Sequence, residues 1–118
     1  MDNLFDYQRL DVYGVAVEFV TTSDTIVSSL PRGRAYLADQ LHRASTSIVL
    51  NIAEGAGERS PADKARFYRF ASRSATESAA ILDICSTLEL SEATLLQQGR
   101  QQLVRVIQML VRLGQSLE

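Results

Sequence analysis

The sequence predicts an all-α protein that folds as a single up-down-up-down antiparallel four-helix bundle, with one domain over residues 1–118. Three observations support this fold class. Apolar residues recur at steps of three and four along four segments, as on one face of a helix. Both prolines, Pro31 and Pro61, fall between those segments. The connections are short, which makes consecutive helices antiparallel neighbours, and 118 residues suit one domain.

The first helix is expected from about Leu4 to Ile26. Two neighbouring apolar stripes run along it, one of Tyr13, Ala16, Val20 and Val27 and the other of Val12, Val15, Phe19 and Ile26. The run YGVAVEFV is rich in β-branched residues, so it would also suit a strand. The length of the segment and the lack of a hairpin partner favour the helix.

The second helix is expected from about Arg34 to Glu54. Its core stripe consists of Leu37, Leu41, Ala44, Ile48 and Ile52. Val49, Leu50 and Ala53 lie off that stripe, so the helix is apolar nearly all round. A helix of this kind is buried on more than one side. In a domain this small, we expect the second side to contact another subunit.

The third helix has a clear start and is expected to end near Leu88. Ser60 suits the N-cap, Pro61 the first position and Asp63 the first turn. Its predicted core stripe consists of Phe67, Phe70, Ala71, Ser74, Ser78, Ile81 and Cys85. The fourth helix is expected to begin after Ser91 as N-cap, with a stripe of Leu96, Gly99, Leu103, Val106, Leu110, Leu113 and Leu117.

The stretch NIAEGAGERS, residues 51–60, joins the second and third helices. A phosphate-binding glycine loop follows a strand and precedes a helix, whereas these glycines follow a helix and lack the accompanying lysine. Gly55 and Gly57 are therefore interpreted as breakers at the C-terminus of the helix that are able to take a left-handed conformation. The stretch is predicted to be a corner between two helices.

Polar residues border the core stripes on the facing edges of the second and third helices. This predicted structural network consists of Gln40, Arg43, Ser47, Asn51, Glu54, Ser74 and Glu77. Half-buried carboxylates need partners, and arginines of the third helix are within reach. The network is interpreted as fixing how the two helices pair, so that Glu54→Ala or Glu77→Ala would be destabilising. A ligand-binding or catalytic role for the same residues is the alternative.

Composition argues against several classes of function. The single cysteine, Cys85, permits no internal disulfide, and it lies on a core stripe as an inert thiol. The only histidine, His42, has Asp39 three residues before it, and no second Asp-x-x-His follows. Ser45 is near His42 without the setting of an activated nucleophile. No apolar run approaches the ~20 residues of a membrane span. We expect a cytoplasmic protein with no enzymatic activity, cofactor, metal or membrane partner.

Charge is unevenly distributed along a chain whose net charge is −2. Residues 32–73 carry eight basic and four acidic side chains, while both flanking regions are acidic. The candidate residues for binding RNA or DNA are Arg32, Arg34, Arg59, Lys64, Arg66, Arg69 and Arg73. Three of these follow helical spacing, which would place a basic face on the third helix. A solvated surface without a nucleic-acid partner is the alternative.

One long stretch, residues 30–77, resembles a known family. Its matching positions are Pro31, Gln40, Arg43, Ala44, Ser47, Ile48, Asn51, Ile52, Ala53, Glu54, Gly55, Ser60, Arg66, Phe67, Ser74 and Glu77. In this order they resemble the bacterial four-helix-bundle proteins first noticed as products of intervening sequences in large-subunit ribosomal RNA genes. The family includes the accessory variability determinant of diversity-generating retroelements.

The resemblance implies a non-enzymatic scaffold of four-helix bundles that assembles into a homopentameric ring. It also implies nucleic-acid binding, because the strongly basic retroelement members look like nucleic-acid binders that partner a reverse transcriptase. This chain departs from them with a sequence pI of about 5.4 and with Arg73 where a small residue is usual. A module that binds a protein partner and no nucleic acid is the alternative function.

Overall fold

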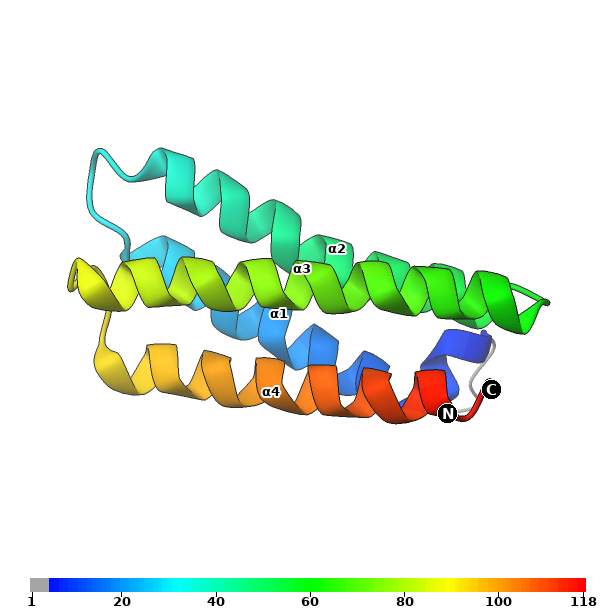
Figure 1. The fold of residues 1–118 in the computed structure, drawn as a ribbon. Coiled ribbons are helices and arrows are strands. Elements are labelled where there is room, and N and C mark those ends of the chain that lie inside the picture. The colour runs from blue at the N-terminus through cyan, green and yellow to red at the C-terminus, as the bar shows by residue number, and fades with distance from the viewer. Residues whose placement is uncertain (1–4) are drawn as a thin grey trace.

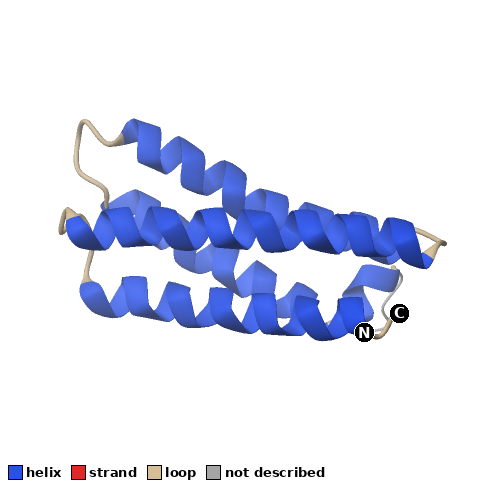
Figure 2. Cartoon of the chain, viewed as in Figure 1, coloured by secondary structure: helices blue, strands red, loops and turns tan. Residues whose placement is uncertain are grey.

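The structure is a computed structural model that describes residues 5–118. A short 3-10 turn, η1 (Asp6–Arg9), precedes four α-helices: α1 (Asp11–Ser29), α2 (Ala35–Gly57), α3 (Pro61–Thr87) and α4 (Ala93–Gln115). Both α1 and α3 contact α2 and α4, so the helices stand at the corners of a square (Figure 1). The described part of the chain contains no strand (Figure 2). The predicted all-α four-helix bundle is confirmed.

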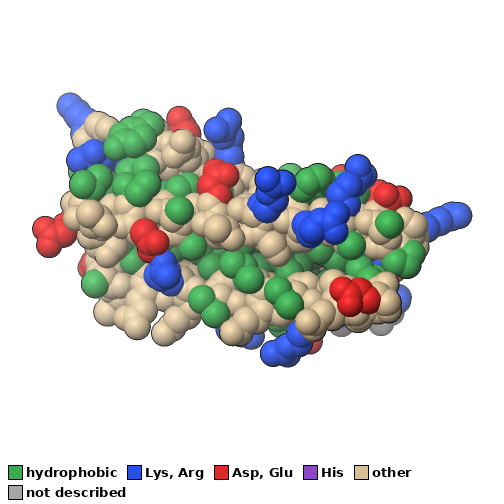
Figure 3. Space-filling view, in the orientation of Figure 1, with side chains coloured by type: hydrophobic (Ala, Val, Ile, Leu, Met, Phe, Trp, Pro, Cys, Tyr) green, Lys and Arg blue, Asp and Glu red, His purple; other side chains and the backbone are tan. Residues whose placement is uncertain are grey.

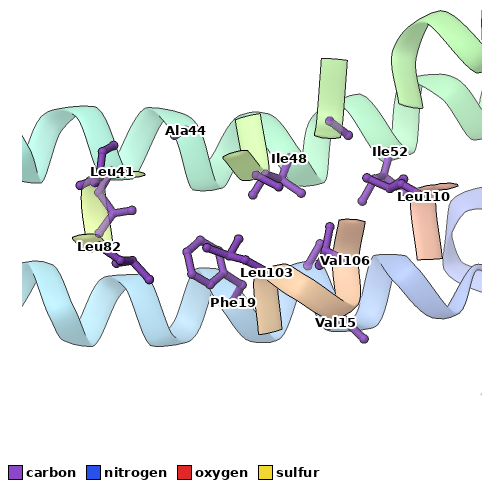
Figure 4. Close-up of a cluster of buried hydrophobic side chains, with 14 of the residues drawn as sticks. Val15, Phe19, Leu41, Ala44, Ile48, Ile52, Leu82, Leu103, Val106 and Leu110 are labelled. Atoms are coloured by element: carbon purple, nitrogen blue, oxygen red, sulfur yellow. The ribbon is translucent and has the colours of Figure 1, made fainter. Parts of the chain in front are cut away.

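The core runs along the axis of the bundle and receives side chains from all four helices (Figure 4). Phe19 of α1, Ile48 of α2 and Val106 of α4 are fully buried. Each such side chain stabilises the fold by about 1.5–3 kcal/mol relative to exposure. The predicted core stripe of α2 is buried throughout, and that of α4 is buried from Leu96 to Leu110.

The prediction for the start of the first helix is wrong. Leu4 lies outside the described residues, and α1 begins at Asp11 because Leu10 has an extended backbone, with φ −85° and ψ 124°. Aromatic rings hold the preceding turn in place: the centroids of Phe5 and Tyr7 are 5.5 Å apart, and those of Tyr7 and Tyr13 are 4.7 Å apart. YGVAVEFV is helical, and α1 extends to Ser29.

The buried face of α3 agrees with the predicted stripe at Ala71, Ser78, Ile81 and Cys85, but it is rotated relative to that stripe in the first half of the helix. Tyr68, Ala75 and Leu82 are buried, whereas Phe70 is 39% exposed and both Phe67 and Ser74 are only half-buried. Gly55 of α2 explains the rotation. A Cβ atom at Gly55 would lie 2.6 Å from Cε1 of Tyr68, so the missing side chain leaves the space that the tyrosine ring fills.

The prediction that Gly55 and Gly57 break the helix in a left-handed conformation is wrong. Both lie inside α2, and among the described residues only Gly33 (φ 94°) and Glu89 (φ 55°) have a positive φ. The helix ends at Gly57 with the help of Lys64 from α3, whose Nζ donates to the carbonyl oxygen of Ala56 at 3.0 Å. A cation is favourable at the carbonyl end of a helix.

The start of α3 agrees with the prediction from the sequence, and the start of α4 does not. Ser60 caps α3 as predicted, since its Oγ accepts from the backbone N–H of Asp63 at 3.0 Å. Ser91 is not the N-cap of α4. Its hydroxyl lies 2.8 Å from that of Ser29 instead, and Glu92 occupies the cap position. A Cβ at Gly99 would lie 3.0 Å from Cδ1 of Leu82, so α4 approaches α3 closely there. No described helix combines the length and apolarity needed to cross a membrane.

Candidate interaction surfaces

Three neutral polar side chains join α2 and α3 and are called here the hydroxyl–amide seam: Ser47, Asn51 and Ser74. The hydroxyl of Ser74 donates to Oγ of Ser47 at 2.9 Å. Nδ2 of Asn51 donates to Oγ and to the carbonyl oxygen of Ser47, each at 2.9 Å. All three residues are half-buried, so these bonds satisfy groups that water reaches poorly.

The charged residues of the predicted network lie outside the seam. Arg43, Glu54 and Glu77 are exposed, as is Gln40. The described residues contain a single ion pair, between Arg100 of α4 and Asp83 of α3, so the expected pairs of Glu54 and Glu77 with arginines are not formed within the chain. Exposed pairs gain at most about 1 kcal/mol, so the absence of these pairs costs the fold little.

Three of the predicted basic residues already have a contact within the chain. Lys64 caps α2, as described above. Nη1 of Arg34 donates to the hydroxyl of Tyr36 at 3.0 Å. The guanidinium carbon of Arg66 lies 5.0 Å from the centre of the Phe67 ring, within the range of a cation–π interaction.

The other basic candidates are exposed to solvent. Arg69 and Arg73 lie on the outer face of α3, Arg59 just before that helix, and Arg32 in the connection between α1 and α2. None of them takes part in an ion pair within residues 5–118. Lysine and arginine side chains are spread along the face shown in Figure 3, with aspartate and glutamate side chains between them.

A groove between α3 and α4 has a volume of about 530 Å³ and is largely apolar. Its lining includes Ala65, Tyr68, Arg69, Leu110, Val111 and Leu117. Burial raises the pKa of the Tyr68 phenol. Val111 is 53% exposed, and Val104, two helical turns earlier on α4, is 50% exposed.

Sequence reasoning missed Val104 and Val111 as surface residues. The signal was present, because they stand seven residues apart, outside the core stripe, on a helix whose other exposed residues are mainly glutamine and arginine.

A second apolar region surrounds Leu50 on the outer side of α2. This side chain is 58% exposed and lines two hollows. One, of about 640 Å³, also has Asn51, Glu54 and Phe67 in its wall. The other, of about 400 Å³, is closed by Phe5 and Tyr7 of the N-terminal segment. Leu50 thus lies on the second apolar side of α2, which faces away from the core.

The residues considered for catalysis are engaged in packing. The hydroxyl of Ser45 donates to the carbonyl oxygen of His42 at 3.2 Å and accepts from Ser23 at 3.1 Å. Cys85 is fully buried, and burial raises the pKa of its thiol. Within residues 5–118, no three side chains of the His, Cys, Asp or Glu type converge as metal ligands.

Comparison with known proteins places the chain in a family. A crystal structure of a protein of unknown function from the S23 ribosomal protein family of Bacteroides thetaiotaomicron has a similar fold, with a TM-score of 0.80 and 20% identity over 87% of this chain and 97% of that one. No curated protein matches the sequence. The profile of the 23S rRNA-intervening sequence protein family matches residues 8–112. The chain therefore belongs to the 23S rRNA-intervening sequence protein family.

Proposed function

We propose that this protein is a non-enzymatic building block that assembles with identical copies into a closed ring, and that the ring serves as a scaffold. The observation that carries the proposal is the placement of large apolar side chains on the outside of every helix. These residues include Val17 on α1, Leu50 on α2, Phe70 and Ile84 on α3, and Val104 and Val111 on α4, all at least 39% exposed.

Single exposed apolar residues are ordinary, but clusters beside grooves mark interfaces. Leu50 stands between two hollows, and Val111 lines the groove between α3 and α4. A ring explains apolar residues on several sides of one bundle, because each copy in a ring uses two different surfaces. The family resemblance of residues 30–77 supports five as the number of copies.

The mass of the assembly in solution tests this proposal. Light scattering or native mass spectrometry at micromolar concentration is expected to give a multiple of the 13.1 kDa chain mass, with five copies as the expected number. A single species of 13.1 kDa at that concentration would contradict the assembly. A mass of three or four chains would retain the ring and exclude the pentamer, whereas a mass of two chains would exclude the ring.

A second candidate function is weak nucleic-acid binding, favoured by the exposure of Arg59, Arg69 and Arg73 without ion pairs among the described residues. Symmetry would repeat these side chains around a ring, and several weak phosphate contacts would then act together. The binding is expected to be independent of base sequence and to fall steeply between ~50 and ~200 mM salt. Gel shifts with RNA and DNA at both salt concentrations measure it.

The absence of any shift at low salt and micromolar protein would exclude this second function. The scaffold would then act through a protein partner alone, and capture of that partner would have to be sought separately. A shift that persists in Arg66→Glu/Arg69→Glu/Arg73→Glu protein would place the nucleic acid on another surface.

A further inference from the structure

We infer that the hollow beside the hydroxyl–amide seam binds a short, extended, uncharged peptide segment of a partner protein. The hollow has a volume of about 640 Å³ and is lined by residues of α2 and α3, which run side by side (Figure 1). Ser47 and Asn51 of the seam form part of its lining. The site is built within one chain, so it goes beyond the proposed assembly and does not depend on the number of copies.

The seam leaves one hydrogen-bond acceptor and one donor unused. The amide atom of Asn51 that lies 2.9 Å from the carbonyl oxygen of Ser47 must be Nδ2, because a carbonyl oxygen only accepts. Oδ1 of Asn51 is therefore left without a donor among the described residues. Oγ of Ser47 accepts from Asn51 and Ser74, and its own proton has no acceptor within residues 5–118. A ligand in the hollow is placed to satisfy both groups.

The main chain of an extended peptide supplies the matching pair of groups. In a strand, the N–H and the C=O of one residue leave the chain on the same side. The N–H donates to Oδ1 of Asn51, and the C=O accepts from the hydroxyl of Ser47. These two groups follow each other in a fixed order from the N-terminus of the peptide to its C-terminus. The peptide therefore runs antiparallel to α2, with its N-terminal end toward Glu54 and its C-terminal end toward Arg43.

The walls of the hollow determine which side chains the peptide carries. Successive side chains of a strand point to opposite sides, so they reach Leu50 of α2 and Phe67 of α3 in turn. Leu50 is 58% exposed and Phe67 is half-buried, and both offer an apolar surface. Arg43 and Glu54 line the hollow with opposite charges, which favours an occupant without net charge. A nucleic-acid backbone is disfavoured, since Glu54 repels phosphate.

The length of the hollow sets the length of the peptide. Arg43 and Glu54 are separated by about 16 Å along α2, at 1.5 Å per residue, and five extended residues cover this distance. The probe is acetyl-Ser-Ala-Leu-Ala-Ser-amide, which has no charge. Its binding to the full chain is measured by ligand-observed NMR, and we expect a dissociation constant of about 1 mM or lower. Failure of the unmodified peptide to bind at about 5 mM would overturn the inference.

Methylation of single peptide nitrogens tests the bond to Asn51 without altering the protein. An N-methyl group on the central leucine removes the N–H that donates to Oδ1 and should weaken binding about tenfold or more. An N-methyl group on the alanine that follows is the matched control, because that N–H points away from the seam. It should weaken binding by less than about threefold. The inference fails if the methyl group on leucine costs no more affinity than the one on alanine.

The direction of the peptide is tested by photo-crosslinking. A benzophenone group at the N-terminus of the probe should label residues of the chain near Glu54, and one at the C-terminus should label residues near Arg43. Mass spectrometry of the digested protein locates both labels. Labelling in the opposite order would contradict the pairing of peptide groups with Asn51 and Ser47.

Two leucines test the apolar wall. Leu50→Ala removes the exposed side chain from the hollow and should weaken binding about fivefold. Leu88→Ala is the same change at a leucine that is 45% exposed and lies outside the hollow, and it should bind the probe like the unmodified protein. Circular dichroism checks that both variants are folded. Unchanged binding by Leu50→Ala would overturn the inference.

The outcomes separate this inference from the functions proposed above. A monomer that binds the probe would end the proposed assembly and retain the peptide site. A protein that binds the probe only below the concentration at which copies associate would give the hollow to a second copy and overturn the inference. Displacement of the probe by single-stranded RNA at ~50 mM salt would give the hollow to nucleic acid and would also overturn it.

Discussion

The α2–α3 pair has an inner edge, which is the hydroxyl–amide seam, and an outer edge, which carries Glu54 and Glu77. The polar residues of the two edges behave in opposite ways. On the inner edge, Ser47 accepts hydrogen bonds from both Asn51 and Ser74, and all three are half-buried and neutral. On the outer edge, Glu54 and Glu77 are exposed and form no ion pair in the described chain. Neutral groups can lose water cheaply if they bond to each other, whereas charged groups remain hydrated. The inner edge therefore holds α2 and α3 together, and the outer edge remains exposed to solvent.

The largest effect is expected from Gly55→Ala, which tests how closely α2 and α3 pack beside the inner edge. The added Cβ would lie 2.6 Å from the buried ring of Tyr68, so either the ring or the two helices must shift. We expect a loss of about 1–3 kcal/mol in the free energy of unfolding, measured by urea denaturation. Gly57→Ala is the matched control, since its Cβ meets no neighbour, and it should stabilise the protein slightly. Equal stability of the two variants would contradict the close contact.

The next test removes the centre of the hydroxyl–amide seam. Ser47→Ala deletes the oxygen that accepts from Asn51 and Ser74 and leaves two donors poorly satisfied. The free energy of unfolding should fall by about 1–2 kcal/mol. Ser74→Ala should cost less, since Asn51 keeps both of its bonds to residue 47. The reverse order of the two losses would show that the seam is not centred on Ser47.

A smaller effect is expected at the end of α2. Lys64→Met keeps the length of the side chain but removes the cation that donates to the carbonyl oxygens of Gly55 and Ala56. The expected loss is about 0.5–1 kcal/mol, by analogy with cations at helix C-termini. Thermal unfolding at low and high salt measures it. A loss that does not shrink as salt rises would point to lost packing instead of charge.

The smallest effect is expected on the outer edge. Glu54→Ala and Glu77→Ala should each change the stability of the dilute protein by less than about 0.5 kcal/mol, as exposed positions do. A large loss seen only at concentrations where copies associate would place the carboxylate in a contact between copies. A large loss in dilute protein would restore the buried charge network that the sequence had suggested.

The fold could be predicted from sequence because α2 and α4 carry unambiguous periodicity. Leu41 and Ile48, like Leu103 and Val106, are buried where spacing places them. The rotation of α3 could not be predicted. Phe67 and Tyr68 are adjacent and similarly apolar, and the choice between them depends on the space left by Gly55 on another helix. Periodicity within one segment contains no information about such a neighbour.

The candidate surfaces were only partly visible in the sequence. Spacing placed Ser47, Asn51 and Ser74 on facing edges, and the structure joins them by hydrogen bonds. Whether Glu54 and Glu77 would be paired depended on how closely the helices pack, which spacing does not determine. Val104 and Val111 were not predicted as exposed apolar residues. Core periodicity identifies the residues that face the core and says nothing about apolar residues outside that stripe.

The square arrangement of the helices has a consequence for the order in which the chain folds. The contacts of α1 with α2, α2 with α3, and α3 with α4 all join helices consecutive in sequence, and such local contacts allow rapid folding. Only the contact between α1 and α4 closes a long loop of chain. A Cβ at Gly99 would lie 3.5 Å from both Phe19 and Thr22 of α1, so α4 packs against α1 at ordinary contact distance where that loop closes.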